Sequence, residues 1–534
     1  MTSSSSLVGV LVSPRGRRVL LTAAVLVYLL EGVYLSRALV SWDDEGSYLT
    51  YAYLVVTGAI SSFEDGMTGQ RMPLPFYLLG TSQLIVGRNL WAARLLSLIF
   101  GLGVLGLTIA VARRLHDGLA GLLAGLFLAT QGALVGYYAT ATYHSLTALI
   151  LMAAVWVLLK DGLPWRYALG MAVASLLFLT RTNMFPALPF LLVWALRGAP
   201  TRVEKSVVVV VAAVPPVMFF LTDPAHLKLL AYVPLLKRLV EPLGYRSQLD
   251  LQGYRQSDLG HQLWSFVLFA RRYESWTLLS LGVVLALIVV RAFGRPLAFP
   301  AARMETALVA GLYGWTLLWH YVIFRLNFKW VIAYFPDFAP LAAVLLGVAT
   351  ATLLTSVDLP RLSRGILLVG LVAGLTISVV VVRNPLLPTP LPRPFRGDPI
   401  QLMERSVARL RALVPAGSRV FLFGQSMPVY LAGLRMYVPQ IMSTGTLAAG
   451  DQDPWLVARN GLWGLAEVER WLGVEAQYAL ISPQFLQASE SDRPESVGRI
   501  RELLQQRFEF VARVDDASWY VYEVYRRREG GAGK

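Results

Sequence analysis

The sequence predicts a polytopic α-helical membrane protein that ends in a soluble α/β domain. Hydrophobic residues make up 56% of the 534 residues and charged residues only 15%, whereas an ordinary soluble domain carries about a quarter charged residues. Apolar segments recur as far as residue 382, and after residue 400 the composition becomes that of a soluble domain. So much apolar surface cannot be buried inside a compact globule, which excludes a soluble multidomain enzyme and an intrinsically disordered chain.

Eleven segments are predicted to cross the membrane, because each is an apolar run suited to a hydrocarbon core of about 30 Å. These segments are 19–35, 91–112, 118–137, 145–159, 167–180, 183–196, 206–221, 276–290, 305–323, 331–354 and 365–382. Arginines precede the first segment and no small-residue cleavage site follows it, so we expect an uncleaved span. Residues 73–87 are apolar but short and open with prolines, which favours a re-entrant or interfacial helix.

Basic residues set the predicted orientation. Several segments between predicted spans carry Lys or Arg: 113–114, 160–166, 197–205, 291–303 and 361–364. When 73–87 is not counted as a span, all of these segments fall on the same side of the membrane as the N-terminal arginines. This positive-inside pattern predicts a bacterial-type cytoplasmic (inner) membrane protein with a cytoplasmic N-terminus. The long segments 36–90 and 222–275 and everything after 382 are then extracytoplasmic. Much of the net charge of +15 is explained by cytoplasmic loops and contact with the anionic lipid bilayer, and we expect no nucleic-acid partner.

Composition divides the chain into a transmembrane domain at 1–383, a proline-rich linker at 384–400 and an α/β domain at 401–534. The transmembrane domain includes the first outer loop, 36–90, with interfacial helices. Strand-like runs at 419–424 and 478–482 alternate with helical stretches, which is typical of an α/β layer. The chain has neither a GxGxxG motif nor a P-loop, so nothing indicates a nucleotide site. It has no cysteine, which excludes disulfides, thiol catalysis and cysteine zinc sites.

Three consecutive acids, Asp43, Asp44 and Glu45, stand where the first span leaves the membrane. Two interpretations are open. The acids suit the positive end of a helix that begins near Gly46, or they form a carboxylate pair that acts as a general base or orients an acceptor. The stretch that follows is rich in tyrosine, and we expect Asp43 and Tyr48 to contact the acceptor or the donor.

Cations and aromatic residues gather on the same predicted face. Arg71 precedes the apolar helix at 73–87, Arg181 lies in a tight turn between two spans, and Arg325 and Lys329 join the ninth and tenth spans. Each alone is compatible with snorkelling at a helix end. Together with the acids they supply what is needed to hold a lipid-linked phosphate beside a general base.

Two further candidates, Tyr143 and His144, stand at the outer end of a predicted span. A lone histidine at such a place is more often a hydrogen-bonded interface residue than a catalyst, although its ordinary pKa also suits proton transfer. We therefore expect Tyr143 and His144 to contact the acceptor or the donor.

Five motifs occur in an order and spacing that resembles the GT-C-fold glycosyltransferases, above all bacterial aminoarabinose lipid A transferases and protein O-mannosyltransferases. They are Asp-Glu-Gly-Ser-Tyr at 44–48, Gln-Arg-Met-Pro-Leu at 70–74, Gly-Arg-Asn-Leu-Trp-Ala-Ala-Arg-Leu at 87–95, Ala-Arg-Arg-Leu at 112–115 and Leu-Thr-Arg at 179–181. The resemblance implies a GT-C transmembrane domain and transfer of a sugar from a polyprenyl-phosphate carrier. It also implies that Asp44, followed by Glu45, supplies the catalytic acid of the first loop. Arg71 and Arg181 stand where those enzymes commonly have lysine.

The function that follows is a single inverting displacement. Asp44 accepts the proton of an acceptor hydroxyl, carried by a lipid, a glycan or a protein, while the lipid phosphate leaves. We expect no cofactor; Asp43, Asp44 and Glu45 offer oxygen ligands that would suit a divalent cation, but metal-independent catalysis is preferred. The alternative is a transporter or flippase of a lipid-linked sugar, because charges within a membrane also mark substrate pathways. The sequence shows no internal repeat that would favour a transporter.

Overall fold

A computed structural model of the chain describes residues 13–41, 43–60, 73–222, 234–246, 302–320, 334–356, 398–448, 453–516 and 520–529, together with short stretches between 227 and 285. Arg71, Arg325, Lys329, the predicted span at 365–382 and nearly all of the predicted linker lie outside these residues. The chain groups into two compact units. One comprises 1–36, 95–217 and 256–393, and the other comprises 37–94, 218–255 and 394–534.

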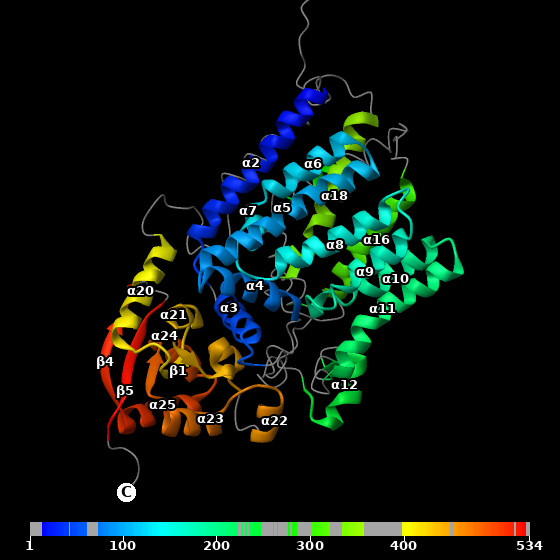
Figure 1. Cartoon of the computed structure of the whole chain (residues 1–534). Helices are drawn as coiled ribbons and strands as arrows, with labels where there is room; N and C mark the ends of the chain where they lie inside the picture. The colour runs from blue at the N-terminus through cyan, green and yellow to red at the C-terminus, as the bar shows by residue number, and fades with distance from the viewer. Residues whose placement is uncertain are drawn as a thin grey trace, which may run out of the picture. The chain divides into compact units, whose positions relative to one another are not determined.

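The first unit is built of helices that follow the predicted apolar segments (Figure 1). The helices in and around this unit are α2 (Pro14–Ala38), α5 (Leu90–Leu115), α6 (Gly118–Ala129), α7 (Gly132–Tyr138), α8 (His144–Leu159), α9 (Arg166–Ser175), α10 (Ala187–Gly198), α11 (Arg202–Thr222), α16 (Arg303–Leu318) and α18 (Ala339–Ser356). Figure 1 shows α6 and α18 side by side, and the two helices pack against each other. Gly347 allows this approach, since a Cβ at that position would lie 2.7 Å from the Ala124 nitrogen.

Among the described residues, α2, α5 and most of α11 (Arg202–Leu221) are long and apolar enough to cross a membrane. A fourth crossing is counted if α6 and α7, which meet at an angle of 75°, form one broken span. The helices α8, α10 and α18 are apolar but shorter. The structure therefore gives several apolar helices, and the count of eleven spans stays a prediction.

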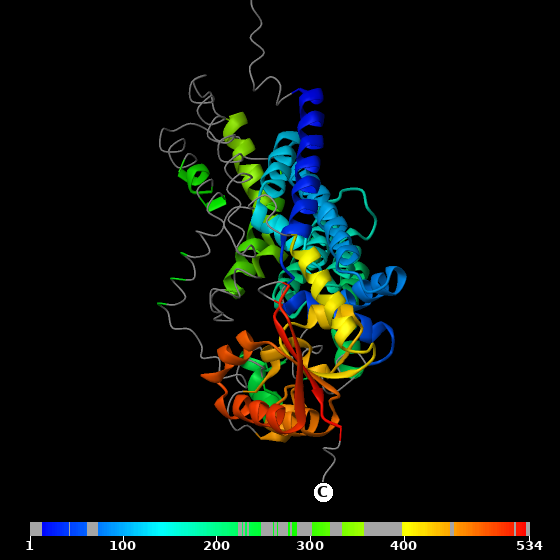
Figure 2. The same ribbon diagram turned by 90° about the vertical axis from the view of Figure 1, so that its left-hand side faces the viewer.

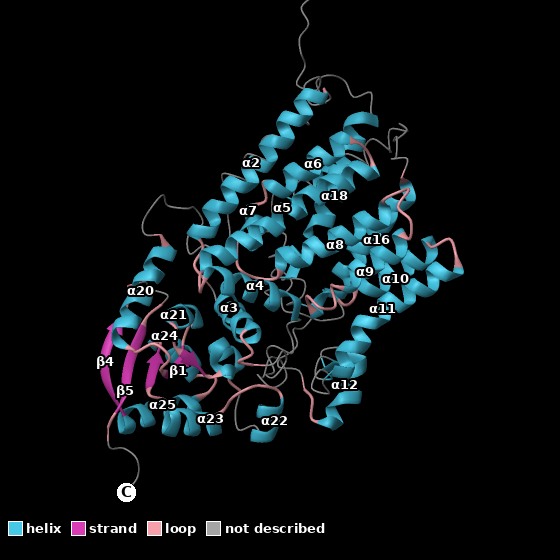
Figure 3. Cartoon of the chain, in the orientation of Figure 1, coloured by secondary structure: helices cyan, strands magenta, loops and turns pink. Residues whose placement is uncertain are grey.

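The second unit contains a five-stranded mixed sheet with the strand order β2-β1-β3-β5-β4. Its strands are β1 (Arg419–Phe423), β2 (Arg435–Met436), β3 (Tyr478–Ile481), β4 (Phe508–Val514) and β5 (Tyr522–Arg527). The strands β2, β1 and β3 are parallel, whereas β5 runs antiparallel to β3 and β4. Figure 2 shows β4 and β5 side by side, and Figure 3 shows the strands gathered in one sheet. Strands thus occur at both positions predicted from the sequence, 419–424 and 478–482.

Helices pack on this sheet around an aromatic core. They are α20 (Pro399–Leu413), α21 (Ser426–Ala432), α23 (Leu465–Arg470), α24 (Pro483–Glu490) and α25 (Pro494–Arg507), while α22 (Pro454–Arg459) contributes to a smaller apolar cluster. Trp463 is fully buried, and its ring meets those of Phe421 and Phe423 edge-on at about 6 Å. Such edge-to-face pairs add to the stability that burial of the rings provides. The sheet and the helices that pack on it therefore share a well-packed core.

The first outer loop belongs by its contacts to the unit with the sheet. It forms α3 (Asp43–Val56) and α4 (Pro73–Val86), which pack against each other, and α3 also packs on α21. Gly46 is required for this packing, because a Cβ there would lie 2.6 Å from the Ser426 hydroxyl and 2.7 Å from the Met427 nitrogen. The sequence placed 36–90 with the transmembrane domain; the predicted short helix at 73–87 is present as α4, 14 residues long.

Candidate functional site

The beginning of α3 gives two neighbouring acids opposite environments. Asp44 is exposed, whereas Glu45 is 1% exposed. Successive residues of an α-helix point about 100° apart, so one acid faces away from the packed side of α3 while the next faces into it. Asp43 is the first residue of α3, and its side chain lies outside the described part of the chain.

Glu45 is held by Arg94, an arginine near the start of α5 that is fully buried. The Nε of Arg94 donates to Oε1 of Glu45 at 2.9 Å, and its Nη2 donates to Oε2 at 2.5 Å. The remaining nitrogen, Nη1, donates to the Leu39 carbonyl at 2.9 Å. This bidentate geometry is the strong form of an arginine–carboxylate contact. Of the two acids predicted to be catalytic, the structure therefore favours Asp44 as the one that can reach a substrate.

A tyrosine completes the surroundings of this pair. Tyr520 is 1% exposed and its hydroxyl donates to the Ser41 carbonyl at 2.8 Å. Burial raises the pKa of Tyr520 above its ordinary value, and the nearby Glu45 carboxylate raises this pKa further, against the opposing effect of Arg94. The Tyr520 hydroxyl therefore stays protonated at neutral pH and donates to the Ser41 carbonyl. This contact stabilises the structure around Arg94 and Glu45.

Tyr48, predicted to contact a substrate, is instead packed between the two helices of the first outer loop. It is 1% exposed, and its ring centroid lies 5.8 Å from that of Phe76 on α4. Tyr51 packs on the same ring and donates from its hydroxyl to the Val438 carbonyl at 3.1 Å. These contacts join α3, α4 and the sheet-bearing part of the same unit, so Tyr48 serves the packing.

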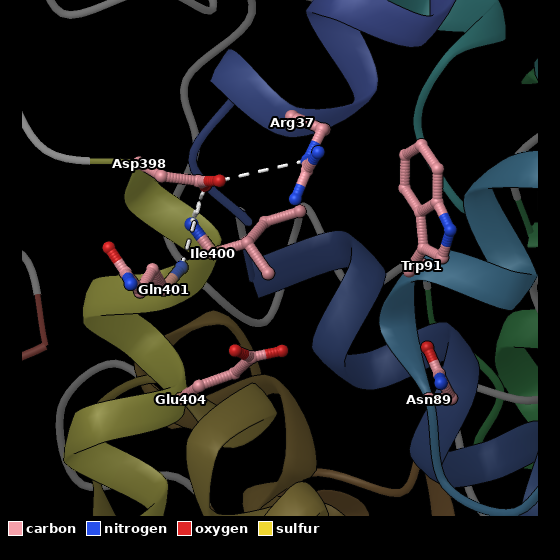
Figure 4. A pocket seen from close by; sticks show the side chains of 7 residues that line it. All are labelled: Arg37, Asn89, Trp91, Asp398, Ile400, Gln401 and Glu404. Atoms are coloured by element: carbon pink, nitrogen blue, oxygen red, sulfur yellow. Dashed lines mark hydrogen bonds and ion pairs between the residues drawn. The ribbon is translucent and has the colours of Figure 1, made fainter. Parts of the chain in front are cut away.

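The second unit also has an open pocket of about 410 Å³ (Figure 4). Its lining consists of Arg37, Asn89, Trp91, Asp398, Ile400, Gln401 and Glu404. Asp398 caps α20 by accepting from the Ile400 nitrogen at 3.0 Å, and it pairs with the Arg37 Nε at 3.7 Å. In Figure 4 the side chains of Arg37 and Glu404 approach the cavity from different elements. None of the residues predicted to be catalytic lines this pocket.

A different set of polar residues is buried within the helical unit. The Asp337 cluster comprises Asp337, His144, Arg181, Asn183 and His320, all between 0% and 8% exposed. His144 begins α8 and Asp337 ends the short 3-10 helix that precedes α18. Arg181 and Asn183 lie in the turn before α10, and His320 follows the end of α16. Four places far apart in the sequence therefore meet in one cluster.

Asp337 is the centre of this cluster. Its Oδ1 accepts from the His144 Nδ1 at 2.7 Å, and its Oδ2 accepts from the Asn183 Nδ2 at 3.0 Å. The Arg181 Nε lies 3.4 Å from the same Oδ2. A carboxylate buried without such donors and a cation would be strongly destabilising. The cluster therefore holds one acid with its charge compensated.

His320 fixes the orientation of the Asn183 amide. The Nδ1 of His320 donates to the Thr316 carbonyl at 2.7 Å, so its Nε2 is the acceptor of a neutral imidazole. The Asn183 Nδ2 lies 3.2 Å from that Nε2 and also donates to Asp337. Because both neighbours require a donor, the amide nitrogen and oxygen cannot be exchanged.

Two buried atoms of the cluster have no hydrogen-bond partner among the residues that the structure describes: Nη1 of Arg181 and Oδ1 of Asn183. We call them the open pair. The guanidinium carbon of Arg181 lies over two aromatic rings, 3.3 Å from the centroid of Tyr143 and 4.5 Å from that of Tyr334. An unpaired buried polar group costs about 1–3 kcal/mol, so an open donor and an open acceptor in the same cluster point to a ligand.

Of the predicted site residues, the structure brings Tyr143, His144 and Arg181 together. Sequence reasoning missed Asp337, Asn183, His320 and Arg94. Asp337 and His320 each stood inside a predicted span, where an ionisable residue is by default a functional candidate, so a signal was present. Within the described parts of the chain, no group of three or more His, Asp or Glu side chains is arranged to hold a metal ion.

No family model and no curated protein matches the chain. Solved structures do match. ArnT from Cupriavidus metallidurans, bound to undecaprenyl phosphate, is similar with a TM-score of 0.58 and 15% identity, over 98% of this chain and 100% of that chain. An oligosaccharyltransferase from Archaeoglobus fulgidus is similar with a TM-score of 0.53 and 11% identity, over 92% of this chain and 73% of that one. Both are GT-C-fold glycosyltransferases. The fold of this chain is the GT-C fold.

The arabinofuranosyltransferase AftD from mycobacteria shares the GT-C fold as well, with a TM-score of 0.51 and 15% identity over 97% of this chain and 40% of that chain. The resemblance predicted from the order of the five motifs is thus confirmed at the level of the fold. At these identities the likeness concerns the fold and not the chemistry.

Proposed function

We propose that the protein is an integral membrane glycosyltransferase that moves a sugar from a polyprenyl-phosphate carrier to an acceptor hydroxyl on the extracytoplasmic face. The observation that carries this proposal is the Asp337 cluster, which presents an unpaired donor and an unpaired acceptor in a GT-C fold. The known structures support the choice of donor, since ArnT binds undecaprenyl phosphate and the Archaeoglobus oligosaccharyltransferase has been solved with a dolichol phosphate.

Asp44 is the proposed base. It accepts the proton of the acceptor hydroxyl while that oxygen forms a bond to the anomeric carbon of the sugar. The bond between this carbon and the phosphate oxygen breaks in the same step, and the polyprenyl phosphate leaves with its electron pair. One displacement of this kind inverts the anomeric centre. The exposure of Asp44, set against the pairing of Glu45 with Arg94, supports this assignment.

The phosphate that leaves requires cations, because its negative charge grows as the bond breaks. The sequence predicts this role for Arg71, Arg181, Arg325 and Lys329, and we propose it for Arg71, Arg325 and Lys329. The proposed step uses no metal. Glu45 has its two oxygens engaged by Arg94, which leaves the three predicted acids with fewer oxygen ligands for a divalent cation.

The proposed setting is the cytoplasmic (inner) membrane, with the N-terminus in the cytoplasm and the α/β domain outside. There a polyprenyl-phosphate sugar is a suitable donor, because its lipid carrier holds the activated sugar in the membrane. The acceptor is proposed to be a hydroxyl of a lipid, a glycan or a protein.

The proposal is tested with the full chain reconstituted in lipid vesicles. Undecaprenyl-phosphate sugars carrying a radiolabelled sugar are supplied with lipid, glycan and peptide acceptors. We expect the label to pass to one acceptor class, with one undecaprenyl phosphate released for each sugar transferred. Movement of the intact labelled lipid between leaflets, without transfer to any acceptor, would instead establish the flippase alternative.

A further inference from the structure

The open pair can distinguish between the two polar parts of a lipid-linked donor, the sugar and the phosphate. We infer that Arg181 Nη1 and Asn183 Oδ1 bind a hydroxyl group of the donor sugar rather than the carrier phosphate. This inference rests on the proposed function and deepens it, because it names the part of the donor that reaches the Asp337 cluster.

The charge of Arg181 is already opposed within the cluster. Its Nε lies 3.4 Å from the Oδ2 of Asp337, a carboxylate that is 0% exposed. A phosphate at Nη1 would bring a second negative charge close to that buried carboxylate, and like charges in a poorly solvated site repel strongly. A neutral hydroxyl group meets no such repulsion.

The pattern of donors and acceptors leads to the same ligand. The open pair consists of one donor and one acceptor, and a hydroxyl group both donates and accepts. An ionised phosphate oxygen only accepts, so it would leave the Asn183 oxygen facing another acceptor. Rotation of the amide cannot remedy this mismatch, since its nitrogen is engaged by His320 Nε2 at 3.2 Å and Asp337 at 3.0 Å.

The other members of the cluster are positioning residues in this account. Asp337 holds both the Arg181 guanidinium and the Asn183 amide through its Oδ2, and His144 occupies the Oδ1. Tyr143 and Tyr334 both lie against the guanidinium carbon of Arg181, so their rings occupy part of the space around this side chain.

A site built to hydrogen-bond a hydroxyl discriminates strongly against a substrate that lacks it, because the site's buried polar groups are then left unpaired. We expect one hydroxyl of the donor sugar to contribute far more to kcat/KM than the other hydroxyls do. Removal of that hydroxyl should lower kcat/KM by about 100-fold or more, whereas removal of the others should have much smaller effects.

The test compares binding of undecaprenyl phosphate, which has no sugar, with binding of undecaprenyl-phosphate sugars to wild type and to Asn183→Leu. The variant should weaken binding of the preferred sugar lipid by about tenfold or more and leave the affinity for undecaprenyl phosphate unchanged. Gln506→Leu is the matched control, since it removes an amide on the exposed side of α25 and should change neither affinity. Equal weakening of both ligands would overturn the inference in favour of a phosphate site, and no change for either would overturn it in favour of a structural role.

A second measurement does not depend on the folding of a variant. Wild-type protein is assayed with donor sugars that lack one hydroxyl at a time, and one position should show the large loss. If removal of each hydroxyl lowered kcat/KM by the same small factor, the inference would be overturned. The proposed function would still stand, because sugar transfer would have been observed. Absence of transfer and of sugar-lipid binding with every donor would instead overturn the proposed function on which the inference rests.

Discussion

Two buried arginine–carboxylate contacts among the described residues, Arg94 with Glu45 and Arg181 with Asp337, are built differently. All three nitrogens of Arg94 donate to acceptors of its own unit. Arg181 approaches its carboxylate through Nε alone, at 3.4 Å, and keeps Nη1 without a partner among the described residues. A buried arginine beside a carboxylate therefore has all its nitrogens engaged in one unit and keeps one nitrogen open in the other.

This difference separates a structural contact from a candidate binding site. A saturated buried ion pair offers nothing to a ligand, and removal of one partner leaves an uncompensated charge in the interior. An incomplete cluster carries an energetic cost that a ligand can relieve. The comparison therefore predicts that Arg94 acts mainly on folding, whereas Arg181 acts mainly on recognition of the donor.

The largest effect on stability is expected for Arg94→Met. Glu45 would lose both hydrogen bonds from the guanidinium while it stays buried, which costs about 3–5 kcal/mol. Denaturant titration in detergent micelles, followed by tryptophan fluorescence, measures the free energy of unfolding. A loss below about 1 kcal/mol, as for an exposed ion pair, would contradict the structural role of this pair.

Arg181→Met is expected to cost less, about 1–3 kcal/mol. Asp337 would still accept hydrogen bonds from His144 and Asn183, so its carboxylate stays partly compensated. The same denaturant titration measures the free energy of unfolding of Arg181→Met, which can be compared with that of Arg94→Met. If Arg181→Met were as destabilising as Arg94→Met, the contrast between the two contacts would fail.

Tyr143→Leu tests the aromatic clamp on Arg181. Its ring centroid lies 3.3 Å from the guanidinium carbon, and loss of a cation–π contact in a buried site is worth about 0.5–2 kcal/mol. Tyr77→Leu on the outside of α4, where the tyrosine is 49% exposed, is the matched control and should change stability by less than about 0.5 kcal/mol. Equal effects of the two variants would show that Tyr143 contributes only apolar area.

The smallest effects are expected at the exposed pair of Figure 4. Arg37→Ala should cost at most about 1 kcal/mol, because the pair with Asp398 is solvated. Asp398→Ala should cost about 1 kcal/mol through loss of the cap of α20. A larger loss for Arg37→Ala than for Asp398→Ala would mean that the ion pair, and not the cap, stabilises this region.

Much of the fold was predictable because it follows from local patterns. Apolar runs of helical length marked the helices, prolines and length marked α4 as a short helix, and strand-like runs marked β1 and β3. The order of the five motifs indicated the GT-C fold although family models do not match. The grouping of 37–94 with the sheet was not predictable, since it depends on contacts between α3 and α21 that no local pattern encodes.

The site was predictable only in part for the same reason. Tyr143, His144 and Arg181 stood out as polar residues at helix ends. Asp337 lies 193 positions from its partner His144, so no spacing rule relates them. The acidic run at 43–45 did not reveal which acid would be buried, because that depends on which face of α3 packs against the rest of its unit.

The most direct test of the account compares Asp44→Asn with Glu45→Gln in the transfer assay, at a temperature where both variants are folded. The account predicts that Asp44→Asn keeps wild-type stability and loses about 10²–10⁴-fold in transfer rate, the usual contribution of a general base. Glu45→Gln should lose stability but transfer sugar at close to the wild-type rate per folded molecule. Full activity of Asp44→Asn, or an inactive but stable Glu45→Gln, would contradict the division of roles between the two acids.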